Sequence, residues 1–230
     1  MTEDGSKGGP RLPVWTWLVV WMAVWAGVPV ATSALLYGTF NGGAALLAIF
    51  LAINILVCSW EISLGARITD IERWHHDPEA APERPRGSLY FVRVTPRELL
   101  STRLWARVWY EYAYLDPSYA DRKSFGFAID VGNGWSTLVP SLVFLFGMTI
   151  EIMPPVALGL LGALIFWQKF YCTCLYFFTY FFNRRYVGHS FGRVLAAVGG
   201  SNGIWLVFPA IGLWICLQLI FEGSYSVIHG

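Results

Sequence analysis

Five long apolar runs separated by polar segments constrain the fold of this chain more than any other feature. Each run is long enough to cross the hydrocarbon core of a bilayer as a helix. Of the 230 residues, 56% are hydrophobic and only 13% are charged, about half the usual charged share of a soluble domain. In a bilayer, only helices and closed barrels satisfy their own backbone hydrogen bonds. We therefore predict an all-α membrane protein built as a five-transmembrane-helix bundle.

The expected spans divide a single membrane domain into four parts. Residues 1–13 are expected to be a disordered N-terminus, and 14–64 to hold transmembrane helices 1 and 2. Residues 65–123 are expected to form a polar and interfacial loop with a helix, and 124–221 to hold transmembrane helices 3 to 5. The individual spans are predicted at 14–37, 44–64, 124–148, 156–182 and 201–221, with a basic loop at 183–200.

The long loop between helices 2 and 3 contains a helix signal. Thr95-Pro96-Arg97-Glu98 has the order of a helix start, with an N-cap Thr, a Pro at the first position and a Glu that closes a capping box. The residues that follow, to about Leu115, mix apolar side chains with arginines and predict an amphipathic helix on the membrane surface. Before it, 87–94 predicts a short extended piece. His75 and His76 are expected in a loop, as a solvated pair rather than as metal ligands.

The distribution of positive charge predicts the topology. Of the sixteen Lys and Arg residues, two precede the first span, ten lie between the second and third, and three lie between the fourth and fifth. The turns 38–43 and 149–155 and the C-terminal segment hold none. Because cytoplasmic loops carry the excess of Lys and Arg, we expect a cytoplasmic N-terminus. A bacterial inner membrane and the endoplasmic reticulum both suit this pattern, and the net charge of +1 suggests no nucleic-acid partner.

Two acidic side chains fall inside the expected spans. Asp130 is the only ionisable residue from Ser124 to Met148, and Glu61 lies near the end of the second span. An acid inside a membrane is costly, so each is a candidate functional residue, although each could also be an interfacial residue that only hydrogen-bonds a neighbouring helix. Lys169, near the middle of the fourth span, could neutralise a buried acid or extend its ammonium to the membrane surface.

Other polar and aromatic side chains in the spans should turn inward to meet these acids, so we expect one polar cavity with aromatic walls. Two carboxyl groups in one water-poor cavity form the pair that proton donation and acceptance require. A Trp face can stabilise a cation formed when an alkene is protonated. We therefore predict acid/base chemistry on a hydrophobic lipid substrate, with Glu61 and Asp130 as catalytic residues and with no metal or organic cofactor. The expected substrate-binding residues are Asn54, Asn133, Trp135, Lys169, Tyr171, Tyr176, Asn202 and Trp205.

Two motifs resemble the emopamil-binding protein family, the EXPERA-domain membrane proteins that include the sterol Δ8–Δ7 isomerase. The first reads W-x-E-Y-A-x-x-D-x-x-Y over residues 109–119, and the acid Asp130 follows eleven residues after its last Tyr. The second is NGIWLVFP at 202–209, which is similar to N-x-x-W-L-V-x-P on the last helix of the family. A weaker match lies at 171–177.

The resemblance implies a proton shuttle that moves a ring double bond of a sterol. Asp130 would replace the third-helix Glu of the family, Glu61 would match the second-helix Glu, and Asn202 and Trp205 would hold the charged intermediate. The second-helix His of the family has no counterpart, because Val57 stands four residues before Glu61. The proton relay would then be formed by Glu61, Asp130 or a tyrosine.

Three functions are consistent with these residues. The first is a cofactor-independent isomerase that shifts a double bond of a polycyclic or isoprenoid lipid by protonation and deprotonation. The second is a membrane-bound terpenoid cyclase that closes a ring through a cation. The third is a sterol- or lipid-binding or transport protein without turnover, similar to the sigma-2-receptor type. Gly159 and Gly162 on the fourth span would also permit the close helix packing of a homodimer.

Overall fold

The computed structural model describes residues 9–81 and 89–230. Within these ranges, five helices are long and apolar enough to cross a membrane, as the sequence predicts: Val14–Tyr37, Gly42–His76, Phe125–Ile150, Pro155–Phe182 and Phe191–Glu222. The protein is therefore mostly helical, with the helices of a membrane-embedded chain. Residues 1–8 of the expected disordered N-terminus and 87–88 of the expected extended piece lie outside the described residues.

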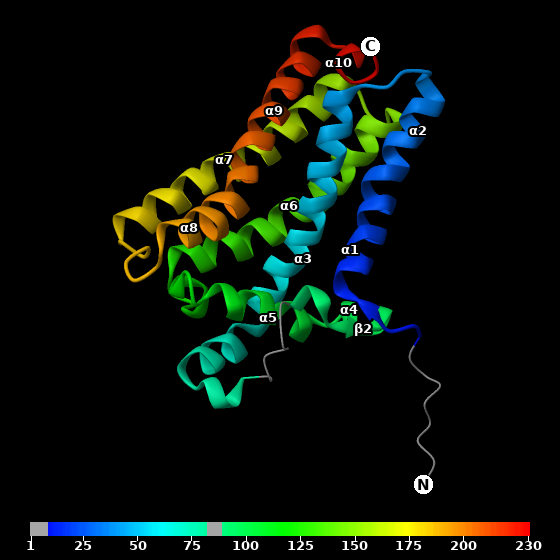
Figure 1. The fold of residues 1–230 in the computed structure, drawn as a ribbon. Helices are drawn as coiled ribbons and strands as arrows, with labels where there is room; N and C mark the ends of the chain where they lie inside the picture. The colour runs from blue at the N-terminus through cyan, green and yellow to red at the C-terminus, as the bar shows by residue number, and fades with distance from the viewer. Residues whose placement is uncertain (1–8, 82–88) are drawn as a thin grey trace.

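The first span is a continuous helix with a π-helical stretch in its middle. It consists of α1 (Val14–Met22), the stretch Ala23–Gly27 and α2 (Val28–Tyr37). Gly38 ends it with φ 69°, a left-handed conformation that glycine adopts without strain. Asn41 then starts α3 (Gly42–His76), because its side chain accepts a hydrogen bond from the N–H of Ala44 at 3.0 Å. In Figure 1, α1 and α2 lie on one side of α3, and α7 and α9 lie on the other.

The second span is longer than predicted. Instead of ending at Leu64, α3 continues to His76, with a kink at Arg67 where φ is −123° and ψ is 16°. Ile68, Ile71 and Trp74 recur at helical spacing beyond the kink and are buried, so an apolar face continues past the membrane-spanning run. The prediction of a loop for His75 and His76 is therefore wrong, because both lie in the last turn of α3.

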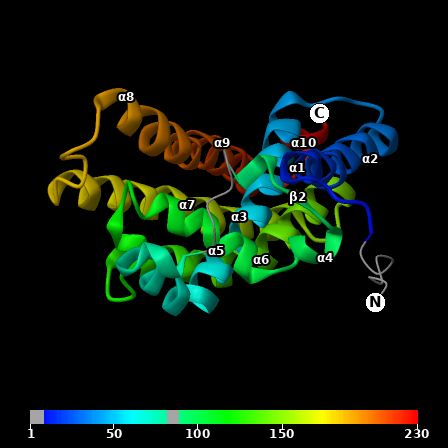
Figure 2. The same ribbon diagram turned by 60° about the horizontal axis from the view of Figure 1, so that its bottom comes forward.

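In its described part, the segment between α3 and α6 contains two helices where the sequence predicted one. α4 (Pro96–Leu99) begins with the predicted capping box, in which Thr95 and Glu98 exchange hydrogen bonds. The chain leaves the helix at Leu100 and starts again as α5 (Thr102–Tyr112). α5 packs against α3 and buries Trp105 and Trp109 among its apolar residues. Figures 1 and 2 show α5 crossing the bundle beside the lower part of α3.

A short sheet connects the N-terminus to this segment. β1 (Leu12–Pro13) pairs antiparallel with β2 (Arg93–Val94), with Leu12 opposite Val94. Residues 12–13 are thus ordered, unlike the disordered N-terminus that the sequence predicted. The residues of this segment that the structure describes also form short 3₁₀ turns at Pro78–Ala80, Leu89–Phe91 and Pro117–Ala120.

The C-terminal half consists of two long helices followed by a helix that begins inside the expected basic loop. α6 (Phe125–Ile150) packs along α3, and α7 (Pro155–Phe182) packs along α9 (Ser201–Glu222). α9 continues from α8 (Phe191–Val194) through the π-helical stretch Leu195–Gly200, so only part of 183–200 is a loop. α10 (Ser226–His229) ends the chain. Figure 2 shows α8 and the end of α7 projecting away from α1 and α2.

Two glycines on α7 allow close contacts with neighbouring helices of the same chain. A Cβ at Gly159 would lie 2.8 Å from the carbonyl oxygen of Cys216 on α9. A Cβ at Gly162 would overlap the Cys216 sulfur and the Phe144 ring. The two glycines therefore allow α7 to approach α9 and α6, so the close packing that they permit lies within one chain.

The buried side chains form two large clusters along the length of the bundle. The first joins α3, α6, α7 and α9 and includes Phe50, Phe144 and Phe166. The second joins the far part of α3 to α5 and the end of α7, and includes Trp74 and Tyr180. Residues 53–61 of α3 and 169–176 of α7 lie between the two clusters, and this is where the main cavity is found.

Candidate functional site

A cavity of about 350 Å³ lies between α3, α6, α7 and α9, with α5 beside it. Its lining is mostly apolar and aromatic, with a small number of polar groups, as is usual for sites that bind small organic molecules. Seven of the predicted site residues line it: Glu61, Asp130, Asn133, Lys169, Tyr176, Asn202 and Trp205. The expectation that side chains from separate spans converge on one cavity is therefore met for these seven.

Glu61 and Lys169 form a buried ion pair on the wall of the cavity. Lys169 Nζ lies 3.3 Å from Glu61 Oε2, and the two side chains are 4% and 6% exposed. Lys169 thus neutralises a buried acid and does not extend to the membrane surface. Its ammonium also lies 5.3 Å from the centre of the Trp205 ring, a cation–π distance. The Trp205 face that was expected to stabilise a substrate cation therefore already contacts a cation of the protein.

Asp130 faces the cavity from α6 with a tyrosine beside it. Tyr119, in the 3₁₀ turn Pro117–Ala120 that precedes α6, lines the same cavity. Burial raises the pKa of Tyr119 well above that of a free phenol, and the negative charge of Asp130 acts in the same direction. Tyr119 is therefore a neutral hydroxyl at physiological pH and can donate its proton to a carboxylate oxygen of Asp130.

The position of Asp130 relative to Glu61 depends on a close contact between two backbones. Gly134, one helical turn after Asp130, lies against α3 at Glu61. A Cβ at Gly134 would be 2.8 Å from Glu61 Cβ and 2.9 Å from the carbonyl oxygen of Cys58, both shorter than real contacts. Only glycine fits this crossing of α6 and α3, which brings the two acid-bearing helices together.

A second polar group in the cavity consists of two tyrosines and an asparagine. Tyr112 and Tyr176 share a hydrogen bond between their hydroxyls at 3.1 Å, and Asn202 Nδ2 donates to the Tyr112 hydroxyl at 2.9 Å. Burial raises the pKa of Tyr112, so its hydroxyl is also neutral at physiological pH. These side chains come from α5, α7 and α9 and form a hydrogen-bonding wall that could orient an oxygen-bearing ligand.

A buried ion pair holds the turn that precedes α6. Asp116 is completely buried, and its Oδ1 lies 3.0 Å from Arg185 Nη1. Asp116 also accepts a hydrogen bond from the N–H of Ser118 at 3.0 Å, which shapes the turn that carries Tyr119. The ion pair thus connects this turn to the loop after α7, and it explains why an acid stands at this position of the 109–119 motif.

Asn133 is oriented by a neighbouring helix. Its side-chain oxygen accepts a hydrogen bond from Gln168 Nε2 at 2.8 Å, and the same Gln168 nitrogen lies 2.7 Å from the Ser136 hydroxyl. The oxygen of the Asn133 amide is therefore engaged with α7, while the residue lines the cavity. Gln168 was not among the predicted site residues.

Three predicted site residues do not line the cavity. Asn54 is fully buried and donates a hydrogen bond to the Ser141 hydroxyl at 2.8 Å. Trp135 is 68% exposed, because Gly134 next to it takes the face toward α3. Tyr171 is 48% exposed and stacks on Trp167, since two residues along a helix turn it about 200° away from Lys169. The structure therefore does not bring these three side chains to the cavity.

The cavity also contains residues that sequence reasoning did not assign to it. They lie on α3, in the 3₁₀ turn Leu89–Phe91, on α5, in the turn before α6 and on α7, and they include Trp60, Tyr90, Val108, Trp109, Tyr119 and Cys172. Trp109 and Tyr119 belong to the 109–119 motif, so a signal for them existed. Tyr90 and Val108 come from the segment expected to lie on the membrane surface, and no pattern in the sequence indicated that it contributes to the cavity.

In the part of the chain that the structure describes, no three His, Cys, Asp or Glu side chains are arranged to hold a metal ion. Cys172 lines the cavity, whereas Cys174 is exposed, as expected for residues two apart on a helix.

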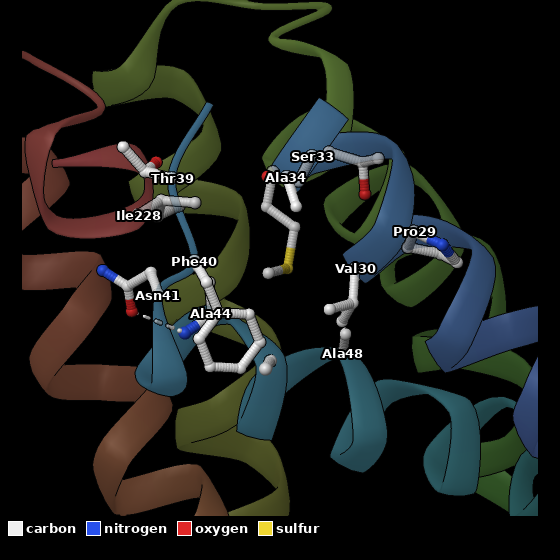
Figure 3. Close-up of a pocket in the computed structure, with 13 residues that line it drawn as sticks. Pro29, Val30, Ser33, Ala34, Thr39, Phe40, Asn41, Ala44, Ala48 and Ile228 are labelled. Atoms are coloured by element: carbon white, nitrogen blue, oxygen red, sulfur yellow. Dashed lines mark hydrogen bonds between the residues drawn. The ribbon is translucent and has the colours of Figure 1, made fainter. Parts of the chain in front are cut away.

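A second hollow lies at the other end of the bundle and is much smaller. Figure 3 shows its lining from α2, the 38–41 turn, α3 and α10, with Ser33, Asn41 and Ile228 among the labelled residues. Its volume is about 20 Å³, room for roughly one water molecule. The hollow is therefore too small for an organic ligand, and the 350 Å³ cavity is the candidate functional site.

No known protein-family model matches this chain, and no curated protein or solved structure shows significant similarity to it. The resemblance to the emopamil-binding protein family therefore depends on its motifs alone.

Proposed function

We propose that this protein is an intramembrane acid/base enzyme that shifts a double bond in a polycyclic or isoprenoid lipid. The observation that carries the proposal is that Glu61 and Asp130, from two different helices, line one mostly apolar cavity. A protonated carboxyl group held in such a cavity can protonate a carbon–carbon double bond, and a second, ionised carboxylate can accept a proton from a neighbouring carbon. The substrate is a hydrophobic lipid, because the rest of the lining is largely aliphatic and aromatic.

The roles follow from the contacts of each acid. Asp130 is the proton donor, since the neutral Tyr119 hydroxyl stabilises the carboxylate that proton donation leaves behind. Glu61 is the proton acceptor, and Lys169 holds its carboxylate in position at the cavity wall. The hydrogen-bonding wall formed by Tyr112, Tyr176 and Asn202 orients the substrate. Protonation and deprotonation need no redox partner, so no organic cofactor is required by this reaction.

The charges in the cavity suit a short-lived cation. The ion pair of Glu61 and Lys169 is neutral as a unit, so the carboxylate formed at Asp130 is the net negative charge that appears as the substrate becomes positive. The Lys169 ammonium already lies over the Trp205 ring, 5.3 Å from its centre. We therefore assign stabilisation of the substrate cation mainly to Asp130 and only secondarily to Trp205.

Solvent deuterium is the sharpest test of this reaction. Lipids that copurify with the protein are identified by mass spectrometry and incubated with the enzyme in D₂O. An isomerase transfers one deuteron from the solvent to carbon and returns a product of unchanged ring count. Asp130→Asn should abolish product while a thermal shift on lipid addition persists. Absence of deuterium from every product of the wild-type enzyme would overturn the proposal.

The same experiment separates the cyclase alternative. A terpenoid cyclase also takes up a solvent deuteron, but its product contains a new ring, which nuclear magnetic resonance of the product reveals. This outcome would keep the acid/base roles and change the substrate to a polyene or an epoxide.

A lipid-binding protein without turnover is the second candidate, and one observation favours it. Lys169 engages both Glu61 and the Trp205 ring, so two of the groups expected to act on substrate already contact a side chain of the protein. A binder would retain a lipid in the cavity with no deuterium uptake in the wild type. For a binder, Tyr176→Phe would reduce retention of the lipid, because the Tyr176 hydroxyl is lost from the hydrogen-bonding wall.

A further inference from the structure

A groove lined by arginines lies beside α5. It has a volume of about 340 Å³ and is lined by Arg11, Arg93, Arg103 and Arg107, with Glu98 as its acid. None of these five residues lines the 350 Å³ cavity. The groove is therefore a separate site, and what it binds does not depend on the proposed enzymatic function.

The groove is built by segments that are far apart in the sequence. Arg11 Nη2 donates to the carbonyl of Arg93 at 3.0 Å, and Arg93 Nε donates to the carbonyl of Arg11 at 3.2 Å. These two hydrogen bonds continue the pairing of β1 with β2 and fix both arginines at one side of the groove. Arg103 and Arg107, one helical turn apart on α5, form the other side.

The charges of the lining are strongly positive. Glu98 opposes the four arginines, and its oxygens are already engaged: Oε2 accepts from the N–H of Thr95 at 2.7 Å, and Oε1 lies 3.2 Å from Arg11 Nη2. The same groups lower the pKa of Glu98, so it is ionised at neutral pH. The lining then carries a net charge of about three positive units, and guanidinium groups bind phosphate oxygens well.

The groove also lies where the first apolar helix begins. Val14, the first residue of α1, donates its N–H to the carbonyl of Val92, and Trp17 Nε1 donates to the carbonyl of Val94 at 3.1 Å. Val92, Val94 and Leu104 add apolar surface to the lining. A site at the end of a membrane-spanning helix, with Trp beside it, is at the depth of lipid headgroups.

From these observations we infer that the groove binds the phosphate of an anionic lipid headgroup. The arginines contact the phosphate, and the apolar residues contact the start of the lipid tails. Anionic lipids are concentrated on the side of the membrane that also holds Lys- and Arg-rich loops, and their negative surface attracts arginines close to the bilayer. The charge distribution of the whole chain, with ten of its sixteen Lys and Arg between the second and third spans, fits the same side.

The test measures lipid retention by native mass spectrometry of the full chain in nanodiscs. The nanodiscs contain phosphatidylcholine with a minor fraction of phosphatidylglycerol. Wild-type protein is expected to retain phosphatidylglycerol in preference to phosphatidylcholine. Arg93→Gln/Arg103→Gln should weaken this retention roughly 30-fold, which is about 1 kcal/mol for each arginine removed. Single Arg103→Gln, which leaves the hydrogen bonds between Arg11 and Arg93 intact, should weaken it about 5-fold.

The matched control is Arg97→Gln/Arg193→Gln, which removes the same net charge from two exposed arginines that do not line the groove. It should leave retention within about twofold of the wild type. Equal loss in the control and in the groove variant would overturn the inference, because the attraction would then come from the overall charge. Inorganic phosphate is added to nanodiscs of phosphatidylcholine alone as a separate arm. A groove-dependent thermal shift with phosphate but no preference for phosphatidylglycerol would also overturn it, in favour of a soluble phosphate ligand.

Discussion

Lys169 Nζ and Glu61 Oε2 lie 3.3 Å apart as an ion pair whose side chains are 4% and 6% exposed. Lys169 lies on α7 and Glu61 on α3, and the two residues are 108 positions apart in the sequence. The pair places both charges of a salt bridge in a water-poor cavity, so removing one partner leaves the other buried and uncompensated.

Removing the lysine alone should therefore be more harmful than removing both charges. We expect Lys169→Met to lower the free energy of unfolding by about 3–5 kcal/mol. Lys169→Met/Glu61→Gln should recover a large part of that loss, because no isolated charge remains. The measurement is equilibrium unfolding of the single and double variants in mixed micelles. Additive losses in the double variant would show that the two side chains do not stabilise each other.

Gly134 should tolerate no side chain, because α6 contacts α3 at this residue. Gly134→Ala places a Cβ 2.8 Å from Glu61 Cβ and 2.9 Å from the Cys58 carbonyl oxygen, and we expect a loss of about 1–3 kcal/mol. Gly132→Ala is the matched control two residues away, since nothing lies within 4 Å of its added Cβ. Thermal unfolding of both variants checks the difference. A Gly134→Ala protein as stable as Gly132→Ala would contradict the close crossing of the helices.

The Tyr112 hydroxyl should matter for the ligand more than for folding. Tyr112→Phe removes the hydrogen bonds to the Tyr176 hydroxyl and Asn202 Nδ2, each of which contributes about 0.5–1.5 kcal/mol. We expect weaker retention of the copurifying lipid, measured by mass spectrometry. Tyr114→Phe is the control, because it also loses a tyrosine–tyrosine hydrogen bond, at 2.7 Å with Tyr110, but does not line the cavity. Equal effects of the two variants would argue against an orienting role for Tyr112.

The C-terminal turn should detach at acid pH. The ring of His229 stacks on Tyr37, its Nδ1 lies 3.1 Å from the Ser33 hydroxyl, and its Nε2 lies 3.6 Å from Glu151 Oε1. Burial lowers the pKa of His229, and the charge of Glu151 opposes this only in part. The unfolded turn then binds a proton more readily than the docked turn. Docking is favoured above the unfolded pKa of about 6.5 and is lost as the pH falls through the lower docked pKa.

Hydrogen exchange measured by mass spectrometry checks this expectation. Protection of residues 224–230 should fall on going from about pH 7.5 to about pH 5. His229→Gln should remove this pH dependence, and His189→Gln, in the loop after α7, should leave it unchanged. Protection that stays constant in the wild type would show that His229 does not control the docking of the turn.

The five spans were predictable because each depends on the local apolar character of a run of residues. The helix start at Thr95 was predictable for the same reason, since a capping box involves only four consecutive residues. The end of α3 was not, because Ile68, Ile71 and Trp74 are buried by α5, a contact between segments about 35 residues apart. The break at Leu100 and Ser101, which divides the predicted interfacial helix, also has no local signal.

The site was predictable in its residue types and less so in its geometry. Five of the six charged and amide side chains among the predicted residues line the cavity, and the sixth, Asn54, is buried, since exposing them to lipid is costly. Trp135 and Tyr171 do not follow this rule, because aromatic side chains are stable on a lipid-facing surface and their position on the helix decides where they point. The partner of Lys169 could not be chosen from the sequence, since Glu61 and Asp130 were equally available by type.

The contact at Gly134 sets how far apart the backbones of Glu61 and Asp130 lie along α6. Because Gly134 lies against Glu61 and Asp130 is four residues earlier on α6, the backbones of the two acids are offset by about 6 Å along α6. This offset is set by the crossing of two helices and not by flexible side chains. The two carbons that a double-bond shift protonates and deprotonates lie close together in one ring, so both carboxyl groups must extend from these offset positions toward a common point, and a side chain at Gly134 would push apart the helices that carry them.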